Sequence, residues 1–401
     1  MKKKEQMSAL ILSTLAMIIS FAVWSVFSPI ASTLQEQYQL SETQKSFIIV
    51  TPIILGSLMR IPIGIIADKY GARKVYTLMM LFTVFPMVAV GFANSFTALL
   101  FWAFLIGMAG TTFTIAVTYV TKWFPPEKQG LVLGIIGIGN LGTAVASLSL
   151  PTIVERFGSQ WAFWSLAIAI SIMAFIFWIG TKELPKPKKV NTLKDSLSVT
   201  SIKATWVLSL YYFLTFGGFV AFGFYLPTLL QEVFHLNAVN SGLTVAGFVI
   251  IATFIRPLGG YVADKFGANQ VLIFLFSGIT LCATVMALSV NDFRFFSSSC
   301  VVMALFLGAG NGAVFKLVPT VSPTNTGAVT GIISAIGGIG GFFPPLVMGV
   351  LKSVTGSYSA GFILLAFFAL GCLVVTIYSL YTDTQKYKSR NIRIKNTKQT
   401  Y

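Results

Sequence analysis

Residues 57–73 read SLMRIPIGIIADKYGAR, and residues 253–269 repeat the pattern as TFIRPLGGYVADKFGAN. At an offset of 196, Arg60 aligns with Arg256 and Asp68 aligns with Asp264. In each copy a lone arginine lies inside an apolar run that ends at a polar turn. A charged side chain at the centre of a bilayer costs about 2.5–3.5 kcal/mol. Two arginines at matching positions therefore indicate a duplicated chain whose halves use both arginines for one purpose.

The composition is that of a membrane protein. Of 401 residues, 55% are hydrophobic and 10% are charged, whereas a soluble domain carries roughly 25% charged residues. Apolar stretches of about 20 residues, enough to cross the hydrocarbon of a bilayer, recur along the chain. The sequence predicts an all-α membrane protein with twelve transmembrane helices in two pseudo-symmetric six-helix bundles. The predicted spans are approximately 8–30, 46–66, 75–93, 97–119, 131–153, 161–181, 205–230, 242–262, 270–289, 296–318, 328–350 and 358–380.

The basic residues are distributed unevenly between alternate loops. The net charge of +16 would by itself suit a nucleic-acid-binding protein. Lysine and arginine, however, gather in alternate loops and at both chain ends, and the intervening loops carry only Lys45, Arg156, Arg294 and Lys352. This is the positive-inside pattern. It predicts a multi-pass membrane protein with both termini cytoplasmic, and it argues against nucleic acid as a partner.

A polar segment divides the chain. Residues 181–195 read TKELPKPKKVNTLKD and separate the two sets of spans. We expect an N-terminal six-helix bundle at 1–181, a cytoplasmic linker at 182–203, a C-terminal six-helix bundle at 204–381 and a basic cytoplasmic tail at 382–401. Membrane lipid with anionic headgroups would attract the linker and the tail, at about 1 kcal/mol per basic residue.

The loop after the second predicted span, GIIADKYGARK (64–74), fits the pattern G-x-x-x-D-[RK]-x-G-x-[RK]-[RK]. A second copy, GYVADKFGANQ (260–270), lacks the last two basic residues. A doubled loop of this kind in a twelve-helix chain resembles the major facilitator superfamily. The resemblance implies that Asp68 and Asp264 hold helix ends together in the outward-facing state through charge–dipole contacts. The alternative is that both aspartates are solvated turn charges.

Two predicted spans are rich in glycine. Residues 130–142 read GLVLGIIGIGNLG and residues 327–343 read GAVTGIISAIGGIGGFF, with matching glycines at an offset of 197. Glycine removes side chains from a helix face and lets neighbouring helices approach closely. Most such glycines serve packing alone. We expect four of them to allow the helices to slide as the protein changes state: Gly137, Gly139, Gly337 and Gly338.

Together with Arg60 and Arg256, these glycine-rich spans and the block GAGNGAVFKLVP (308–319) resemble the nitrate/nitrite porter family. The resemblance implies that the two arginines bind the anion from opposite halves. It also implies an aromatic wall around the site and a hydrogen bond to the anion from a polar residue in mid-membrane. The wall residues are Tyr212, Phe216 and Phe113, and the hydrogen-bond donor is Asn140.

The ionisable residues inside the predicted spans favour an anionic substrate. They are Arg60, Arg256 and Lys316, and no predicted span contains a carboxylate that could bind a cation. The guanidinium group is flat, permanently charged and weakly hydrated, and therefore suits a planar oxyanion such as nitrate. Lys316 would either add positive potential to the pathway or extend its amine to the membrane surface. The alternative for the arginines is that each only pairs with backbone carbonyls freed by Pro62 or Pro257.

We therefore expect a secondary transporter of the bacterial cytoplasmic (inner) membrane, acting as a monomer. It would move nitrate and nitrite with no enzymatic step, no cofactor and no metal. Exchange of nitrate for nitrite is favoured, because the predicted spans contain no Asp, Glu or His to carry a proton. The alternatives are proton-coupled nitrate symport, transport of a small organic anion of the formate or oxalate type, and a transporter-like anion sensor.

Overall fold

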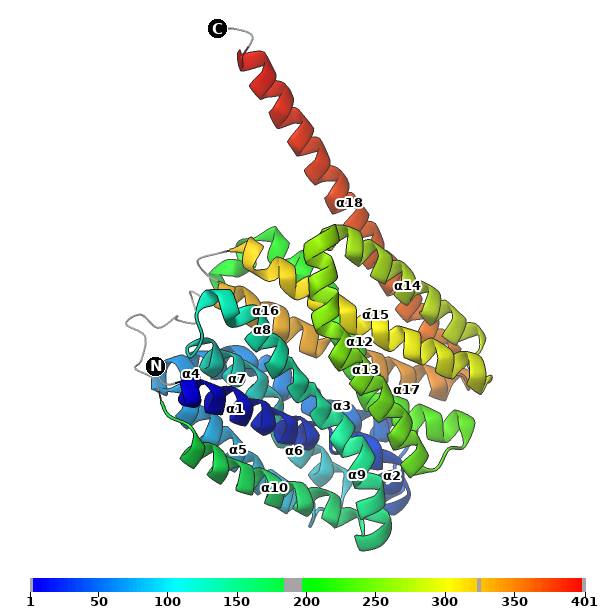
Figure 1. The fold of residues 1–401 in the computed structure, drawn as a ribbon. Helices are drawn as coiled ribbons and strands as arrows, with labels where there is room; N and C mark the ends of the chain where they lie inside the picture. Colours follow the sequence, from blue (N-terminus) through cyan, green and yellow to red (C-terminus); the bar gives the residue numbers. More distant parts are fainter. Residues whose placement is uncertain (1–2, 184–196, 323–325, 399–401) are drawn as a thin grey trace.

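The computed structural model describes residues 3–183, 197–322 and 326–398, and every regular element in these ranges is a helix (Figure 1). The first half contains α1 (Lys3–Trp24), η1 (Ser28–Ile30), α2 (Ala31–Tyr38), α3 (Glu42–Leu58), α4 (Arg60–Tyr70), α5 (Ala72–Val90), α6 (Phe96–Ile106), η2 (Gly107–Thr111), α7 (Thr112–Thr121), α8 (Pro126–Gly137), η3 (Ile138–Asn140), α9 (Leu141–Phe157) and α10 (Ser159–Gly180). The second half contains η4 (Val199–Ser201), α12 (Lys203–Phe234), α13 (Ala238–Phe266), α14 (Ala268–Leu288), α15 (Phe293–Val321), α16 (Thr326–Ile339), α17 (Phe343–Thr355) and α18 (Ser359–Lys398).

These helices account for the predicted spans. Among the described residues, 11 helices are long and apolar enough to cross a membrane, and the number is 12 if α3 and α4, bent by 44°, together form one span. The all-α membrane fold is therefore confirmed. Figure 1 shows α1 to α10 lying together, with α12 to α18 beside them. The exact division at residues 181 and 204 stays a prediction, because residues 184–196 lie outside the described part of the chain.

Each half has its own tightly packed interior. In the first half, the fully buried Tyr76 of α5 donates a hydrogen bond from its hydroxyl to the carbonyl of Ser13 in α1, at 3.1 Å. The ring of Tyr76 also lies 4.8 Å from that of Phe177 in α10. In the second half, α14 packs along α15 and α18. Close packing and hydrogen bonds between helices are what hold membrane bundles together, since lipid is as apolar as their side chains.

The two halves meet closely at one end of the molecule. A Cβ atom on Gly242 of α13 would lie 1.9 Å from the carbonyl oxygen of Ser147 in α9, and one on Gly349 of α17 would lie 2.2 Å from Oγ of Ser46 in α3. Only glycine permits these approaches. We call this end the Glu232 side, because α12 ends there, and we call the opposite end, where α4 reaches Asp68 and α1 begins, the Asp68 side.

The stretch from Gln35 to Lys45, predicted to be an outer loop, is mostly helical. Helix α2 continues to Tyr38, and α3 already begins at Glu42. Ser41 and Gln44 form a capping box, in which the Ser41 hydroxyl accepts from the backbone N–H of Gln44 at 3.2 Å. Lys45 therefore lies inside a helix and is 1% exposed, rather than in a solvated loop.

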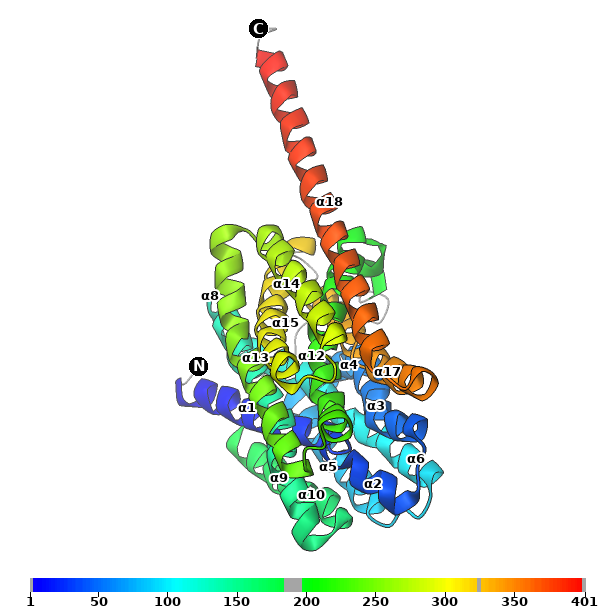
Figure 2. The same cartoon turned by 90° about the vertical axis from the view of Figure 1, so that its right-hand side faces the viewer.

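The end of the chain also differs in form from a simple tail. Helix α18 continues from its predicted span to Lys398, and Figure 2 shows it projecting away from both halves. The predicted basic tail from residue 382 is thus an extension of the last transmembrane helix. A run without proline or glycine from Cys372 onward contains nothing that would end the helix earlier.

Candidate functional site

Arg60 lies at a break between α3 and α4. Pro62 lacks an N–H group, and its ring clashes with the carbonyl four residues earlier, which belongs to Leu58. Helix α3 accordingly ends at Leu58, and α4 begins at Arg60 after a bend of 44°. The side chain of Arg60 is fully buried. The proline therefore sets the direction of the chain at the charged residue.

The guanidinium of Arg60 reaches across to the other half. Its Nη1 donates to the backbone carbonyl of Ser334 in α16 at 2.8 Å, whereas Nε and Nη2 have no hydrogen-bond partner among the described residues. Its Cζ lies 5.9, 5.5 and 5.4 Å from the ring centres of Trp24, Phe113 and Phe216. Aromatic faces stabilise a cation, but two buried N–H groups without acceptors are costly. The arrangement is suited to a hydrogen-bond acceptor that carries negative charge.

Arg256 occupies the corresponding place in α13, directly before Pro257. Its Nη2 donates to the hydroxyl of Tyr212 at 3.3 Å, and its Cζ lies 5.3 Å from the ring centre of Phe315. Its Nη1 is buried and has no partner among the described residues. The alternative prediction was that each arginine only pairs with backbone carbonyls freed by the nearby proline. It is wrong, because the arginines bind other groups. Arg60 binds a carbonyl of the opposite half, and the hydrogen bond described for Arg256 goes to a side chain.

Two aromatic residues of α12 join the arginines. Tyr212 and Phe216 are one helical turn apart, and their rings stack at 4.9 Å with an interplanar angle of 4°. Phe216 faces Arg60, and Tyr212 holds Arg256. The structure thus brings together five residues predicted for the site, one of them from α7: Arg60, Arg256, Tyr212, Phe216 and Phe113.

Asn140 is close to this group but is partly engaged by its own turn. It is 3% exposed and lies in η3, where its Nδ2 donates to the carbonyl of Gly137 at 2.9 Å. Its Oδ1 has no partner among the described residues. A Cβ on Gly137 would lie 3.9 Å from Nη1 of Arg256, so this turn of the first half faces the arginine of the second half.

A cavity of about 320 Å³ connects the site with the Asp68 side. It begins at Arg256 and Phe113 and reaches Asp68 and Lys122, whose side chains are 28% and 29% exposed. The rest of its wall comes from α7, α8, α15 and α16. These further lining residues are Thr114, Val117, Thr118, Thr121, Leu133, Phe315, Val318, Thr330, Gly331 and Ser334.

The four glycines predicted to allow sliding are not equivalent. A Cβ on Gly338 would lie 2.3 Å from Oγ of Ser57 and 3.4 Å from Cζ of Arg60, so Gly338 lies at the contact between the halves. A Cβ on Gly337 would meet the ring of Tyr212 at 2.2 Å, and one on Gly139 would meet Met17 at 2.4 Å. Gly337 and Gly139 therefore permit close packing within one half.

Each repeated aspartate is paired with a lysine of its own half. Lys122, directly after α7, lies 2.6 Å from Asp68, and Lys316 of α15 forms an ion pair with Asp264. Neither interpretation of Lys316 from the sequence included this partner. The signal was nevertheless present, because KWFP (122–125) and KLVP (316–319) match at an offset of 194. The internal repeat thus extends to a lysine–aspartate pair on the Asp68 side of each half.

Sequence reasoning missed several residues around the site. Ser334 contributes a backbone carbonyl, which no side-chain pattern reveals. Trp24 and Phe315 flank the two arginines and belong to apolar runs, where aromatic residues are common. An ion-pair group around Glu232, which closes the opposite side, was also missed because its members lie far apart in the sequence.

Two helical halves around a pair of positive charges, with a cavity that leads from them to the Asp68 side, define a membrane transporter. The chain belongs to the Major Facilitator Superfamily, whose family model matches residues 13–343. This membership confirms the predicted superfamily and the prediction of a multi-pass transporter rather than an enzyme.

Among curated proteins, the chain is 36% identical over 375 residues to a nitrite extrusion protein of Bacillus subtilis, covering 94% of this chain and 95% of the relative. It is 37% identical over 379 residues to the probable nitrate transporter NarT of Staphylococcus epidermidis, covering 94% and 97%. Among solved structures, a human organic anion transporter matches with a TM-score of 0.75 at 14% identity, covering 92% of this chain and 99% of that one. A bacterial homologue of the human lysosomal transporter Spinster, inward-facing and occupied, matches with a TM-score of 0.71 at 18% identity, covering 95% and 98%. These two structures share the fold.

Proposed function

We propose that this protein is a secondary transporter of nitrate and nitrite, and that Arg60 and Arg256 bind the anion between them. One observation carries the proposal. Three guanidinium nitrogens of these two residues, Nε and Nη2 of Arg60 and Nη1 of Arg256, are buried without an acceptor among the described residues. The names of the relatives over the full length point to the same substrates.

The chemistry of the wall suits a small planar anion. Guanidinium groups donate in a flat fork that matches planar oxyanions, and such charge-assisted hydrogen bonds are about twice as strong as neutral ones. Tyr212 and Phe216 offer flat apolar faces, which tolerate a weakly hydrated anion better than a strongly hydrated one. Phe113 closes the site from the first half, and the second amide N–H of Asn140 remains available for the substrate.

The distribution of charge supports an orientation. The Asp68 side carries Lys69 in the last turn of α4 and Arg73 and Lys74 at the start of α5, and Lys265 follows Asp264. On the Glu232 side, Lys45 and Lys352 are both bound to Glu232. The positive-inside rule then places the Asp68 side, with both termini, in the cytoplasm. In this orientation the cavity opens to the cytoplasm, and the monomer contains the complete pathway.

Exchange is the mode of transport that the two arginines favour. Like charges a few ångströms apart repel by about 4 kcal/mol at an effective dielectric near 20. One bound monoanion offsets much of this repulsion, so a loaded carrier switches between its two states more readily than an empty one. Nitrate would enter and nitrite would leave through the same site.

Counterflow tests the substrate directly. Purified protein in liposomes loaded with nitrate, nitrite, formate or buffer is supplied with isotopically labelled nitrate outside. We expect nitrate and nitrite inside to accelerate uptake by about tenfold or more over buffer. Acceleration by formate alone would instead assign a small organic anion. Binding of nitrate without any counterflow would assign a sensor.

A further inference from the structure

A partly buried group of ion pairs joins the two halves on the Glu232 side. Lys45 of α3 is 1% exposed, and its Nζ lies 2.7 Å from Oε1 of Gln35 and 3.0 Å from Oε2 of Glu42, both in its own half. The same Nζ also forms an ion pair with Oε1 of Glu232, at the end of α12 in the other half. Lys45 is therefore shared between one carboxylate of each half.

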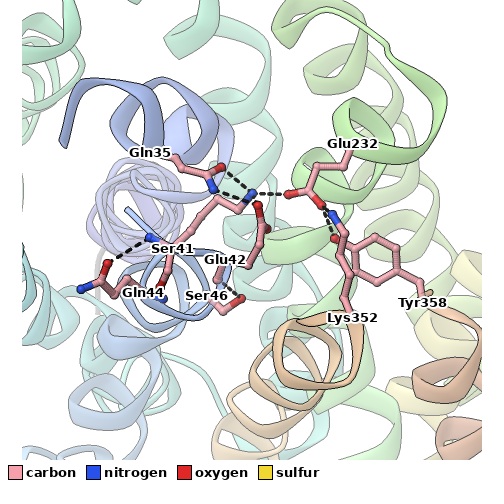
Figure 3. Close-up of polar contacts among 9 residues, drawn as sticks. Gln35, Ser41, Glu42, Gln44, Ser46, Glu232, Lys352 and Tyr358 are labelled. Atoms are coloured by element: carbon pink, nitrogen blue, oxygen red, sulfur yellow. Dashed lines mark hydrogen bonds and ion pairs between the residues drawn. The ribbon is translucent and has the colours of Figure 1, made fainter. Parts of the chain in front are cut away.

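Glu232 has partners of its own in the second half. Its Oε2 forms an ion pair with Lys352 of α17 and accepts a hydrogen bond from the hydroxyl of Tyr358, before α18 (Figure 3). Burial raises the pKa of Tyr358, so its hydroxyl keeps the proton that it donates. Glu232 is 15% exposed and Lys352 is 24% exposed, so water reaches this group only in part.

The ion-pair group lies where it can control the access of a solute to the site from the Glu232 side. Next to it, the close contact of Gly349 with Ser46 brings α17 against α3. The pair of Lys45 with Glu232 is an ion pair that joins α3 of the first half directly to α12 of the second half. Separation of α3 from α12 and α17 has to break it before a solute can pass on this side.

We propose that Lys45 and Glu232 form a reversible latch on the Glu232 side, whose strength is set by competition between Glu42 and Glu232 for Lys45. When the latch opens, Lys45 stays with Glu42 and Gln35, and Glu232 stays with Lys352 and Tyr358. Each half then keeps one positive and one negative charge. Breaking a buried ion pair is costly chiefly when it leaves a charge without a partner, and here neither charge is left alone.

The competition gives two similar substitutions opposite effects. Glu232→Gln removes the carboxylate across the interface, so Lys45 keeps only Glu42 and the latch weakens. Glu42→Gln removes the carboxylate that receives Lys45 on opening, so Glu232 holds the lysine alone and the latch tightens. A group that only stabilises the fold would be weakened by either change, with no opposite shift in access.

The test measures the opening directly and needs no substrate. Spin labels are attached after Glu36→Cys and Ser353→Cys, two exposed positions on the Glu232 side in opposite halves, with the three native cysteines replaced. Pulsed electron spin resonance then gives the populations of short and long distances between the labels. We expect Glu232→Gln to raise the ratio of long to short distances by about tenfold, and Glu42→Gln to lower it by a similar factor.

A third variant keeps the latch testable if Glu232→Gln fails to fold. Tyr358→Phe removes a hydrogen bond that stabilises Glu232 within its own half, so it should favour the closed latch, in the same direction as Glu42→Gln. Shifts of Glu42→Gln and Glu232→Gln in the same direction, or no shift in any variant, would overturn the latch. The outcome is independent of counterflow, so a different substrate would leave the latch intact.

Discussion

At the scale of single residues, the geometry of the guanidinium fork decides the function of Arg60 and Arg256. Lysine in either place keeps the charge but loses the planar set of donors. We expect Arg60→Lys and Arg256→Lys each to reduce nitrate uptake by at least about tenfold, since a hydrogen bond to a charged group contributes about 1.5–3 kcal/mol. Uptake and protein level are measured in the same membranes. Arg294→Lys, at an exposed arginine on the Glu232 side, is the matched control. Near-normal uptake in either site variant contradicts the assigned role.

Gly338 provides a second test at this scale. Alanine there would place a methyl group 2.3 Å from Oγ of Ser57, at the contact between the halves. We expect Gly338→Ala to slow exchange several-fold while leaving the protein folded, since the clash falls on a surface that moves. Gly134→Ala is the matched control, because a Cβ at Gly134 meets nothing within 4 Å. Equal rates for the two variants would show that Gly338 does not limit the conformational change.

At the scale of elements, the bend between α3 and α4 sets the position of Arg60. Pro62→Ala restores an N–H group that can bond to the carbonyl of Leu58, so the two helices should straighten and move the guanidinium away from the rings of α12. We expect weaker nitrate binding by calorimetry and slower uptake. Pro257→Ala should have a smaller effect, because α13 is one helix from Ala238 to Phe266 despite its proline. An equal loss in both variants would argue against a role for the bend.

The elements also show what periodicity and repeats can predict. The spans and the paired arginines followed from hydropathy and from an internal alignment, whereas the aromatic residues of α12 followed from the resemblance to the nitrate/nitrite porter family. Gly71 and Gly267 illustrate why the repeat is so clear, since both end a helix with positive φ, at 104° and 91°, which favours glycine. The breaks at η2 and η3 could not be placed from hydropathy, which carries no information on close backbone contacts between helices. One such contact is Gly107 against the carbonyl of Pro52.

At the scale of the whole molecule, the contacts between side chains of one half and groups of the other could not be predicted from the sequence. Arg60 binds a carbonyl 274 residues away in the other half, and Glu232 meets Lys45 of the other half at a separation of 187 residues. The sequence suggested only an ordinary loop charge at Lys45, because its partner Glu232 comes from a helix that becomes a neighbour only after both halves assemble. The site itself was easier to predict, since both of its charges lie inside apolar spans.

The most direct test of the account is uptake of labelled nitrate into liposomes with and without internal nitrite, at fixed membrane potential and with an imposed pH gradient. Two arginines remain charged at any physiological pH, so their repulsion should hold back the empty carrier. We expect internal nitrite to accelerate uptake by about tenfold or more, and the pH gradient alone to give little uptake. Rapid uptake driven by the pH gradient into anion-free liposomes would contradict exchange and establish proton symport.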